Sequence, residues 1–201
     1  MSESRPAEVD VDVVVVGAGG GGLAAALAAV DAGASAVVLE KEERAGGNSA
    51  LSTGSVPGAG TRWQAEAGID DSPARLAADL LRQSGPHDAE ETVEVLAAAS
   101  AGLVEWLVDS HDIDLRLITD YKHVGHSVPR LHAPPSRKGH ALIADMLRAA
   151  KAADVEVLTH SPVDSLVVED GVVRGVVVSG ARSGTYTLRC RAVVLAANGF
   201  G

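Results

Sequence analysis

The sequence predicts an α/β protein in which a parallel sheet is flanked by helices, and three observations support this fold class. Val13 to Val16 form a continuous apolar run, as expected for a strand buried on both faces. An alanine-rich helical segment and a second apolar strand, Ala36 to Leu39, follow directly. A later helical segment, Gly139 to Ala153, leads into another short apolar strand, Val155 to Leu158, which we expect to join the same sheet.

The turn after the first strand has the pattern G-x-G-x-x-G, formed by Gly17, Gly19 and Gly22. The first glycine allows a tight turn, the second lets the backbone approach a pyrophosphate, and the third lets the helix lie close to the sheet. Free N–H groups and the helix dipole favour phosphate at the start of that helix. Gly33 is placed to end the helix. Glu40, after the second strand, is placed to bind an adenosine ribose, so the segment predicts a Rossmann-like dinucleotide site.

The composition of the chain limits its size, its binding partners and its cysteine chemistry. The chain has 201 residues, enough for one domain or slightly more, and its aromatic content of 2% means that Ala, Val and Leu must fill the core. The net charge of -10 argues against binding to nucleic acid or to an anionic membrane surface. Cys190 is the only cysteine, which excludes an internal disulfide and a cysteine-based metal cluster. Residues 1–9 read as a disordered polar tail without a signal peptide, so we expect a cytoplasmic protein.

The middle of the chain combines a small-residue loop with two helices. Lys41 to Gly60 predicts a loop that is either a flexible linker or a backbone surface laid against a ligand. Ser72 is expected to cap one helix, with Pro73 in its first position, and Asp88 to cap a longer one. On the longer helix we expect a buried apolar stripe formed by Val95, Ala98, Ala99, Gly102, Leu103, Trp106 and Leu107.

A basic, histidine-rich segment runs from Asp120 to His140 in this otherwise acidic chain. Its three prolines exclude a helix. We expect it to face an anionic ligand or a phosphate rather than to be a solvated surface loop. A metal site is disfavoured, because no carboxylate or thiol lies at a suitable spacing.

The last part of the chain predicts an antiparallel β-meander followed by one more buried strand. Turn signals separate three short strands, Val163 to Val168, Val172 to Val178 and Thr185 to Leu188. The final strand, Arg191 to Ala196, is followed only by a few turn residues. We therefore expect the sequence to be the N-terminal piece of a longer enzyme.

Taken in order, these segments resemble the FAD-dependent oxidoreductases of the fumarate reductase/succinate dehydrogenase flavoprotein family, with the 3-ketosteroid Δ1-dehydrogenases among its relatives. The matching segments are VVVVGAGGGGLAAALAA, VVLEKEERAGGNS, GHSVPRLHAPPSRKGHALIADML, VDSLVVEDGVVRGVVV and RAVVLAANGFG. The resemblance implies that residues 10–201 form a Rossmann-like FAD-binding domain with a parallel sheet, flanking helices and a β-meander crossover. The cap domain and the C-terminal flavin segment of the family are absent from it.

The resemblance also implies the residues that bind FAD. By analogy with the family, the glycines Gly17, Gly19 and Gly22 bind the pyrophosphate, Glu40 with Lys41 beside it binds the adenosine ribose, and Val163 offers its backbone to the adenine. The GGNS segment lines the region from the pyrophosphate to the flavin, a further segment lies near the isoalloxazine, and a turn closes the site. The residues of these three parts are Gly46, Gly47, Asn48 and Ser49, then Ser52, Thr53 and Gly54, and finally Ala196 and Gly199. Asn48 stands where covalent-flavin members carry a histidine, which implies non-covalent FAD. The family reads A-T-G-G at the closing turn, and Asn198 replaces a glycine there because Asn tolerates positive φ.

The reaction implied by the resemblance is hydride exchange between flavin N5 and a carbon–carbon bond next to a carbonyl or carboxylate of a small-molecule substrate. No catalytic residue is assigned. His126, Arg130 and His132 are candidate polar groups on the substrate or flavin side. Two alternatives remain open: an NAD-dependent enzyme, against which the GGNS segment and the meander argue, and a non-catalytic nucleotide-binding fragment.

Overall fold

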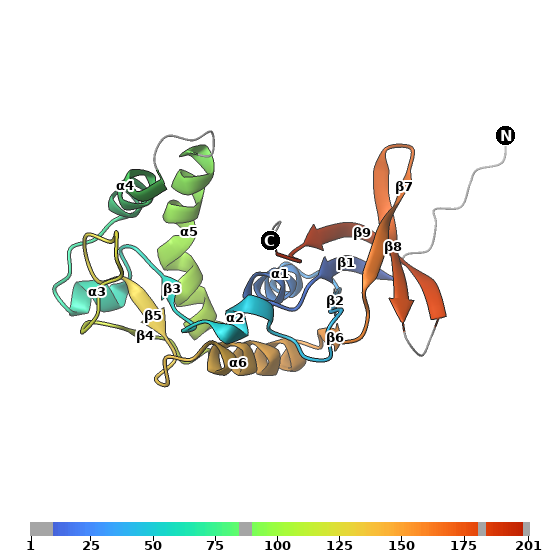
Figure 1. The fold of residues 1–201 in the computed structure, drawn as a ribbon, viewed down its shortest axis with the longest axis horizontal. Coiled ribbons are helices and arrows are strands. Elements are labelled where there is room, and N and C mark those ends of the chain that lie inside the picture. Colours follow the sequence, from blue (N-terminus) through green and yellow to red (C-terminus); the bar gives the residue numbers. More distant parts are fainter. Residues whose placement is uncertain (1–9, 85–89, 181–183, 199–201) are drawn as a thin grey trace. The chain divides into compact units, whose positions relative to one another are not determined.

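The computed structural model describes residues 10–84, 90–180 and 184–198, and the chain divides into two compact units (Figure 1). The first unit combines Met1–Ser49 with Met146–Gly201, and the second is Ala50–Asp145. The expected tail at residues 1–9 lies outside the described part of the chain. No helix within the described ranges is long and apolar enough to cross a membrane.

The first unit is built on a six-stranded sheet in the order β6-β2-β1-β9-β8-β7. Its elements are β1 (Val11–Val16), α1 (Gly20–Asp31), β2 (Ala36–Leu39), β6 (Glu156–Leu158), β7 (Val163–Glu169), β8 (Val172–Gly180) and β9 (Gly184–Leu195). β1 pairs in parallel with β2 and β9, and β2 pairs in parallel with β6. β7, β8 and β9 form the antiparallel meander (Figure 1). The predicted α/β fold with a meander crossover is therefore confirmed.

β9 corrects one detail of the prediction. The segments Thr185 to Leu188 and Arg191 to Ala196, expected as two strands, fall on one strand of 12 residues, and only Ala196 lies beyond its end at Leu195. Its first half pairs antiparallel with β8, and its second half, from Cys190, pairs in parallel with β1. The sequence between the two halves contains no Gly or Pro, so nothing interrupts the extended backbone. This single strand joins the meander to the parallel sheet.

The core of the first unit consists of small aliphatic side chains on both faces of the sheet. Leu23 and Leu27 of α1 are fully buried. A further cluster consists of Val14, Val37, Leu39, Val176, Val178 and Cys190. α1 ends as predicted at Gly33, which has φ 82° and whose N–H donates to the Val30 carbonyl (2.8 Å). The next N–H, that of Ala34, donates to the Ala29 carbonyl (3.0 Å), which completes a Schellman motif.

The second unit packs helices beside a small antiparallel sheet in the order β3-β5-β4. Its elements are β3 (Val56–Pro57), α3 (Arg62–Glu66), α4 (Pro73–Ser84), α5 (Glu90–Asp109), β4 (Arg116–Leu117) and β5 (Leu131–Ala133); α2 (Gly47–Leu51) and α6 (Gly139–Ala152) pass from one unit into the other. The predicted loop at residues 41–60 thus contains a short helix and a strand. Ser72 caps α4 as expected, because its Oγ accepts the N–H of Arg75 (3.3 Å). The other predicted cap, Asp88, lies outside the described residues.

The buried face of α5 differs from the predicted stripe. The buried residues are Ala97, Ser100, Val104 and Leu107, whereas Val95, Ala98, Ala99, Gly102 and Leu103 are exposed and Trp106 is partly buried. The physical reason is Ser100. Its hydroxyl accepts the N–H of Ala59 (3.0 Å) and donates to the carbonyl of Ala97 (2.8 Å), so a polar residue is stable on the buried face.

Candidate functional site

The carboxyl ends of the parallel strands bring three predicted site residues together in the first unit. Gly17 follows β1, Glu40 follows β2 and Ala196 follows β9. The Gly17 N–H donates to the carbonyl of Leu39 (2.8 Å), and the Ala196 N–H donates to the carbonyl of Val16 (2.8 Å). Ligands of open α/β sheets bind at this edge. The arrangement therefore has the position expected of a dinucleotide site.

The glycine turn is close-packed against the strands at Gly17 and Gly22 and exposed at Gly21. Gly17 has φ 102°, and a Cβ there would lie 2.5 Å from the carbonyl oxygen of Ala196. A Cβ at Gly22 would overlap the Gly17 carbonyl, so only glycine lets α1 approach the turn. A Cβ at Gly21 would meet nothing within 4 Å. The first N–H groups of α1 have no partner within the helix, and helix N-termini of this kind bind phosphate groups.

Glu40 holds the glycine turn through its own carboxylate. The side chain is buried, with 7% of the residue exposed. Oε2 accepts the N–H of Ala18 (2.9 Å), and Oε1 accepts the N–H of Glu42 (3.0 Å). Lys41 is exposed and forms a long ion pair with Glu42 (3.8 Å), a pairing that contributes little at a surface. The predicted ribose residue is thus also a structural link between β2 and the turn.

The GGNS segment lies beside the start of α1. Gly46 forms a parallel bridge with Gly19, and its N–H donates to the carbonyl of Ala18 (2.8 Å). The Ser49 hydroxyl oxygen accepts the N–H of Gly20 (3.1 Å), while Gly47 and Asn48 are exposed. Of the two interpretations of this loop, the structure therefore favours an ordered surface over a flexible linker.

The remaining predicted residues of the first unit lie near the same strands. Val163 opens β7 opposite Val178. Just before it, the N–H of Ser161 donates to the Glu40 carbonyl (2.8 Å), which brings this part of the chain to the end of β2. Asn198 has φ 73°, as expected for a residue that replaces glycine in the closing turn. Gly199 lies outside the described residues.

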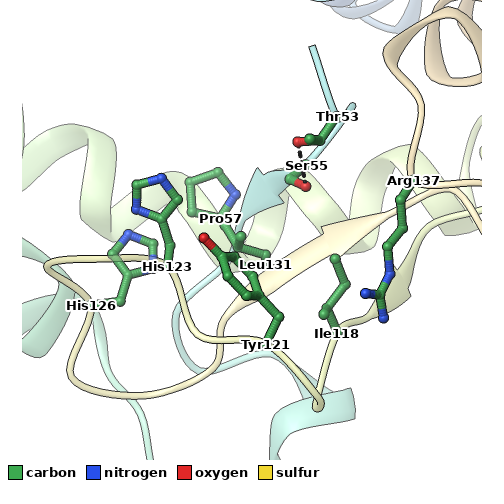
Figure 2. Close-up of a pocket in the computed structure, with 9 residues that line it drawn as sticks. All are labelled: Thr53, Ser55, Pro57, Ile118, Tyr121, His123, His126, Leu131 and Arg137. Atoms are coloured by element: carbon green, nitrogen blue, oxygen red, sulfur yellow. Dashed lines mark hydrogen bonds between the residues drawn. The ribbon is translucent and has the colours of Figure 1, made fainter.

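Ser52, Thr53 and Gly54 belong to the second unit. The Ser52 carbonyl accepts the N–H of Gly139 (2.8 Å), and the Ser52 hydroxyl oxygen accepts the N–H of Gly54 (2.9 Å). Thr53 and Ser55 share a hydroxyl–hydroxyl hydrogen bond of 3.0 Å (Figure 2). These bonds order the segment at the edge of a pocket.

Figure 2 shows this pocket, whose volume is about 560 Å³. Pro57, Ile118 and Leu131 supply apolar surface, and the aromatic rings come from the loop that precedes β5. All the lining residues belong to the second unit: Thr53, Ser55, Pro57, Ile118, Tyr121, His123, His126, Leu131 and Arg137. A volume of this size suits a small organic ligand or one part of a larger cofactor.

The charged groups of the pocket are held or neutralised by their surroundings. Arg137 forms an ion pair with Asp120 (2.5 Å), and this hydrogen bond lowers the pKa of the Asp120 carboxyl. Burial lowers the pKa of His126, and the nearby charges of Arg130 and His123 act in the same direction. His126 Nδ1 is buried and has no hydrogen-bond partner among the described residues. Burial and the charges of Arg130 and His123 both disfavour the protonated form of the His126 ring.

The prediction that three polar residues face a ligand is wrong for two of them, Arg130 and His132. Arg130 is fully buried, and its guanidinium bonds to Asp71 (2.9 Å twice) and to Asp79 (2.8 Å). His132 is also fully buried, between the hydroxyl of Thr61 (3.1 Å) and the Arg130 carbonyl (3.1 Å), and burial lowers its pKa. Both residues stabilise the second unit from inside. The sequence contains no local signal for the side-chain partners Asp71, Asp79 and Thr61, because they lie 51 to 71 positions away.

The histidine-rich segment does contribute to the pocket through other residues. His123 and His126 line it, and their ring centroids are 5.3 Å apart. Tyr121 stands at right angles to His123, with a centroid distance of 6.5 Å. Sequence reasoning did not single out Tyr121 or Ile118. Within the part of the chain that the structure describes, no group of three or more His, Cys, Asp or Glu side chains is arranged to hold a metal ion.

Comparison with known proteins agrees with this geometry. The sequence model of the family described as FAD binding domain matches residues 12–201. Urocanate reductase from Eggerthella lenta is 36% identical over 196 residues, which is 96% of this chain and 32% of that protein. The chain spans about a third of the length of the curated relatives it matches.

Two solved structures are also similar. The open conformation of a flavocytochrome c3 fumarate reductase has a TM-score of 0.87 and 34% identity, over 98% of this chain and 35% of that one. A 3-ketosteroid-Δ4-(5α)-dehydrogenase from Rhodococcus jostii RHA1 has a TM-score of 0.77 and 27% identity, over 96% and 47% of the two chains. The glycine turn, the strand order and these matches agree with one another: the chain belongs to the FAD binding domain family, and its cofactor is FAD.

Proposed function

We propose that this chain is the FAD-binding portion of an oxidoreductase that exchanges hydride between the flavin and a carbon–carbon bond next to a carbonyl or carboxylate. The observation that carries the proposal is that α1 begins directly after a turn in which Gly17 and Gly22 have no room for a side chain. When bound, FAD supplies the redox chemistry. The residues of this chain bind and orient the cofactor.

The proposed cofactor residues divide by the part of FAD that each would hold. Gly17, Gly19 and Gly22 with the N–H groups of α1 would receive the pyrophosphate. Glu40 would bind the adenosine ribose, with Lys41 beside it, and Val163 would present its backbone to the adenine. The GGNS segment, the segment near the isoalloxazine and the closing turn complete the set: Gly46, Gly47, Asn48, Ser49, Ser52, Thr53, Gly54, Ala196 and Gly199. Asn48 has no ring nitrogen to bond to the flavin, so we propose that FAD is held without a covalent link.

We further propose that the pocket of the second unit is the substrate side of the site. Thr53, which we assign to the isoalloxazine region, also lines this pocket. His123 and His126, which line the pocket, would then contact the substrate. The relatives are about three times as long as this chain, so we propose that residues 10–201 act together with a further substrate-binding part. Urocanate, fumarate and 3-ketosteroids, named for the relatives and the similar structures, are the first substrates to test.

The test is the absorption spectrum of the purified chain. We expect flavin bands that bleach with a reductant, and flavin that is released into the supernatant when the protein is precipitated with acid. Anaerobic addition of fumarate or urocanate, which accept hydride, to the reduced protein should restore the bands, and a 3-ketosteroid that donates hydride should bleach the bands of the oxidised protein. A colourless protein that gains thermal stability only with NAD would overturn the proposal, and a protein that responds to neither nucleotide would support the non-catalytic alternative.

A matched pair of serine variants tests the cofactor contacts. Ser49→Ala removes the hydroxyl beside the Gly20 N–H and should weaken FAD binding by roughly tenfold, the effect of one strong hydrogen bond. Ser165→Ala, on the exposed side of β7, is the control and should leave FAD binding unchanged. Titration of FAD fluorescence measures both. Equal affinities for the two variants would contradict the assignment of Ser49.

A further inference from the structure

The loop before β5 carries a tight turn, residues 123–127, that presents two histidines to the pocket (Figure 2). We call it the histidine turn. The N–H of His126 donates to the carbonyl of His123 (3.1 Å), which closes the turn on itself. Within the turn the His123 ring is held by a hydrogen bond between its Nδ1 and the carbonyl of Val124 (2.8 Å), whereas His126 Nδ1 has no partner among the described residues, so what orients the His126 ring must come from outside the turn.

Asp79 on α4 binds the histidine turn at two places. Its Oδ2 accepts both the N–H (2.7 Å) and the hydroxyl (2.8 Å) of Ser127. Its Oδ1 accepts from Arg82 (2.6 Å), and the same Arg82 nitrogen donates to the carbonyl of Gly125 (3.0 Å). One carboxylate therefore holds the end of the turn directly and its middle through Arg82.

Asp79 is itself held in place by the buried Arg130. Its side chain is 2% exposed, and Arg130 donates to its Oδ2 (2.8 Å) from the buried side. Two further hydrogen bonds tie Arg130 to Asp71. Burial acts to raise the pKa of Asp79, but the hydrogen bonds from Ser127, Arg82 and Arg130 outweigh it and the pKa is lowered. The carboxylate therefore stays charged, and charge-assisted bonds of this kind are short and directional.

We propose that Asp79 is a positioning residue for the pocket. Through Ser127 and Arg82 it holds the histidine turn on α4, and it thereby sets the orientation of His126. The inference depends on the proposed function only where it calls the pocket the substrate side. Its physical content is the position of an imidazole in the chain without flavin or substrate.

The state of His126 reports whether the turn is held. Burial is the largest influence on its pKa and lowers it; Arg130 and His123 lower it further, while Asp79 and Asp71 act to raise it. If the turn loosens, the ring gains water and its pKa rises toward its ordinary value. A residue that only stabilised the fold would not change this titration in a protein that remains folded.

The experiment compares matched variants of the whole chain by NMR titration of the histidine rings. Ser127→Ala removes the hydroxyl bond to Asp79 without changing any charge and keeps the N–H bond, and Arg82→Ala removes the link to the Gly125 carbonyl. Ser84→Ala and Arg75→Ala are the controls. Both control residues lie on α4 and are exposed, Ser84 bonds to the Leu80 carbonyl, and Arg75 pairs with Asp70.

We expect Ser127→Ala and Arg82→Ala to raise the pKa of His126 and the controls to leave it unchanged. Ser127→Ala decides the outcome, because loss of the Arg82 charge alone would also raise that pKa. Amide exchange at residues 124–127 should become faster by up to about tenfold, the effect of losing one hydrogen bond. An unchanged His126 titration in Ser127→Ala, or an equal change in Ser84→Ala, would overturn the proposal. Because no flavin is present, absence of FAD binding would not affect this result.

Discussion

The carboxylate Oε2 of Glu40 lies 2.9 Å from the backbone nitrogen of Ala18 and accepts its hydrogen bond. Ala18 is the residue between the first two glycines of the turn, so the end of β2 and the turn after β1 are joined by one side chain. The same carboxylate accepts the N–H of Glu42 (3.0 Å). A residue assigned from sequence to cofactor binding therefore also has a structural role that exists before any ligand binds.

This link makes Glu40→Ala destabilising even without FAD. Two backbone N–H groups would lose their acceptor, and the one beside the buried turn should cost roughly 2 kcal/mol of the free energy of unfolding. Urea unfolding of the protein without cofactor measures the loss. Glu43→Ala, at an exposed position three residues along the chain, should change stability little. Equal stability of the two variants would show that the hydrogen bonds of Glu40 make no net contribution to the free energy of unfolding.

Gly22 and Gly21 differ in the space around them although they are adjacent. A Cβ at Gly22 would overlap the Gly17 carbonyl, whereas one at Gly21 would meet nothing within 4 Å. Gly22→Ala should therefore push α1 away from the turn and cost roughly 1–3 kcal/mol, as overpacking does. Gly21→Ala should leave the stability unchanged or raise it by about 0.5–1 kcal/mol, because alanine favours a helix over glycine. Thermal unfolding without cofactor distinguishes them, and a loss of stability in Gly21→Ala would contradict the geometry.

The buried Arg130 should respond to substitution very differently from an exposed arginine. Arg130→Met leaves the carboxylates of Asp71 and Asp79 buried without their counter-ion, which should cost roughly 3–5 kcal/mol at pH 7. Arg62→Met breaks an exposed ion pair with Asp109 and should have a small effect. Denaturant unfolding of both variants tests the difference.

The pH dependence gives a second test of the same network. The folded pKa of Asp79 is lowered, so its stabilisation is present above its unfolded pKa of about 3.9 and is lost as the pH falls below that value. In Arg130→Met one of the two guanidinium groups bonded to Asp79 is gone, so the difference in unfolding free energy between the variant and the wild type should narrow between pH 5 and pH 3. A gap that stays constant over this range would mean that Asp79 does not depend on Arg130.

Because His132 is buried, we expect the free energy of unfolding to depend on pH near neutrality as well. Burial lowers its folded pKa below the unfolded value of about 6.5, so stability is present above that value and is lost as the pH falls toward the folded pKa. His132→Gln should reduce the slope of stability against pH in this range, to which one proton contributes at most about 1.4 kcal/mol per pH unit. Trp63, whose ring centroid is 5.6 Å from that of His132, reports the transition by fluorescence. The exposed His140→Gln is the control, and an equal slope in both variants would contradict the prediction.

Elements with a strong local signal were predicted closely. The sequence places a strand at Ala36 to Leu39 and a helix from Gly139, and β2 and α6 begin at those residues. Both depend on short-range patterns, an apolar run and a helical repeat, that are complete within the segment. The helix end at Gly33 was predicted for the same reason, because the cap involves only neighbouring residues.

The buried face of α5 shows where local patterns were not enough. Alanine, valine and leucine occur on several sides of this helix, so the spacing of apolar residues is compatible with more than one face. Ser100 decides the face through its bond to Ala59, which is 41 positions away. A helical repeat contains no information about such a partner.

The sequence by itself determined the parallel sheet, the glycine turn, the meander and the FAD family, because each of these is encoded in contiguous residues with a fixed spacing. Only the tertiary structure decided the roles of the polar residues. It assigned Arg130 and His132 to the interior, His126 to a pocket, and Asp79 to the support of that pocket. The physical reason is that a charged or hydrogen-bonding side chain takes its role from partners brought close by folding. Ser127 lies 48 positions from Asp79, and Thr61 lies 71 positions from His132.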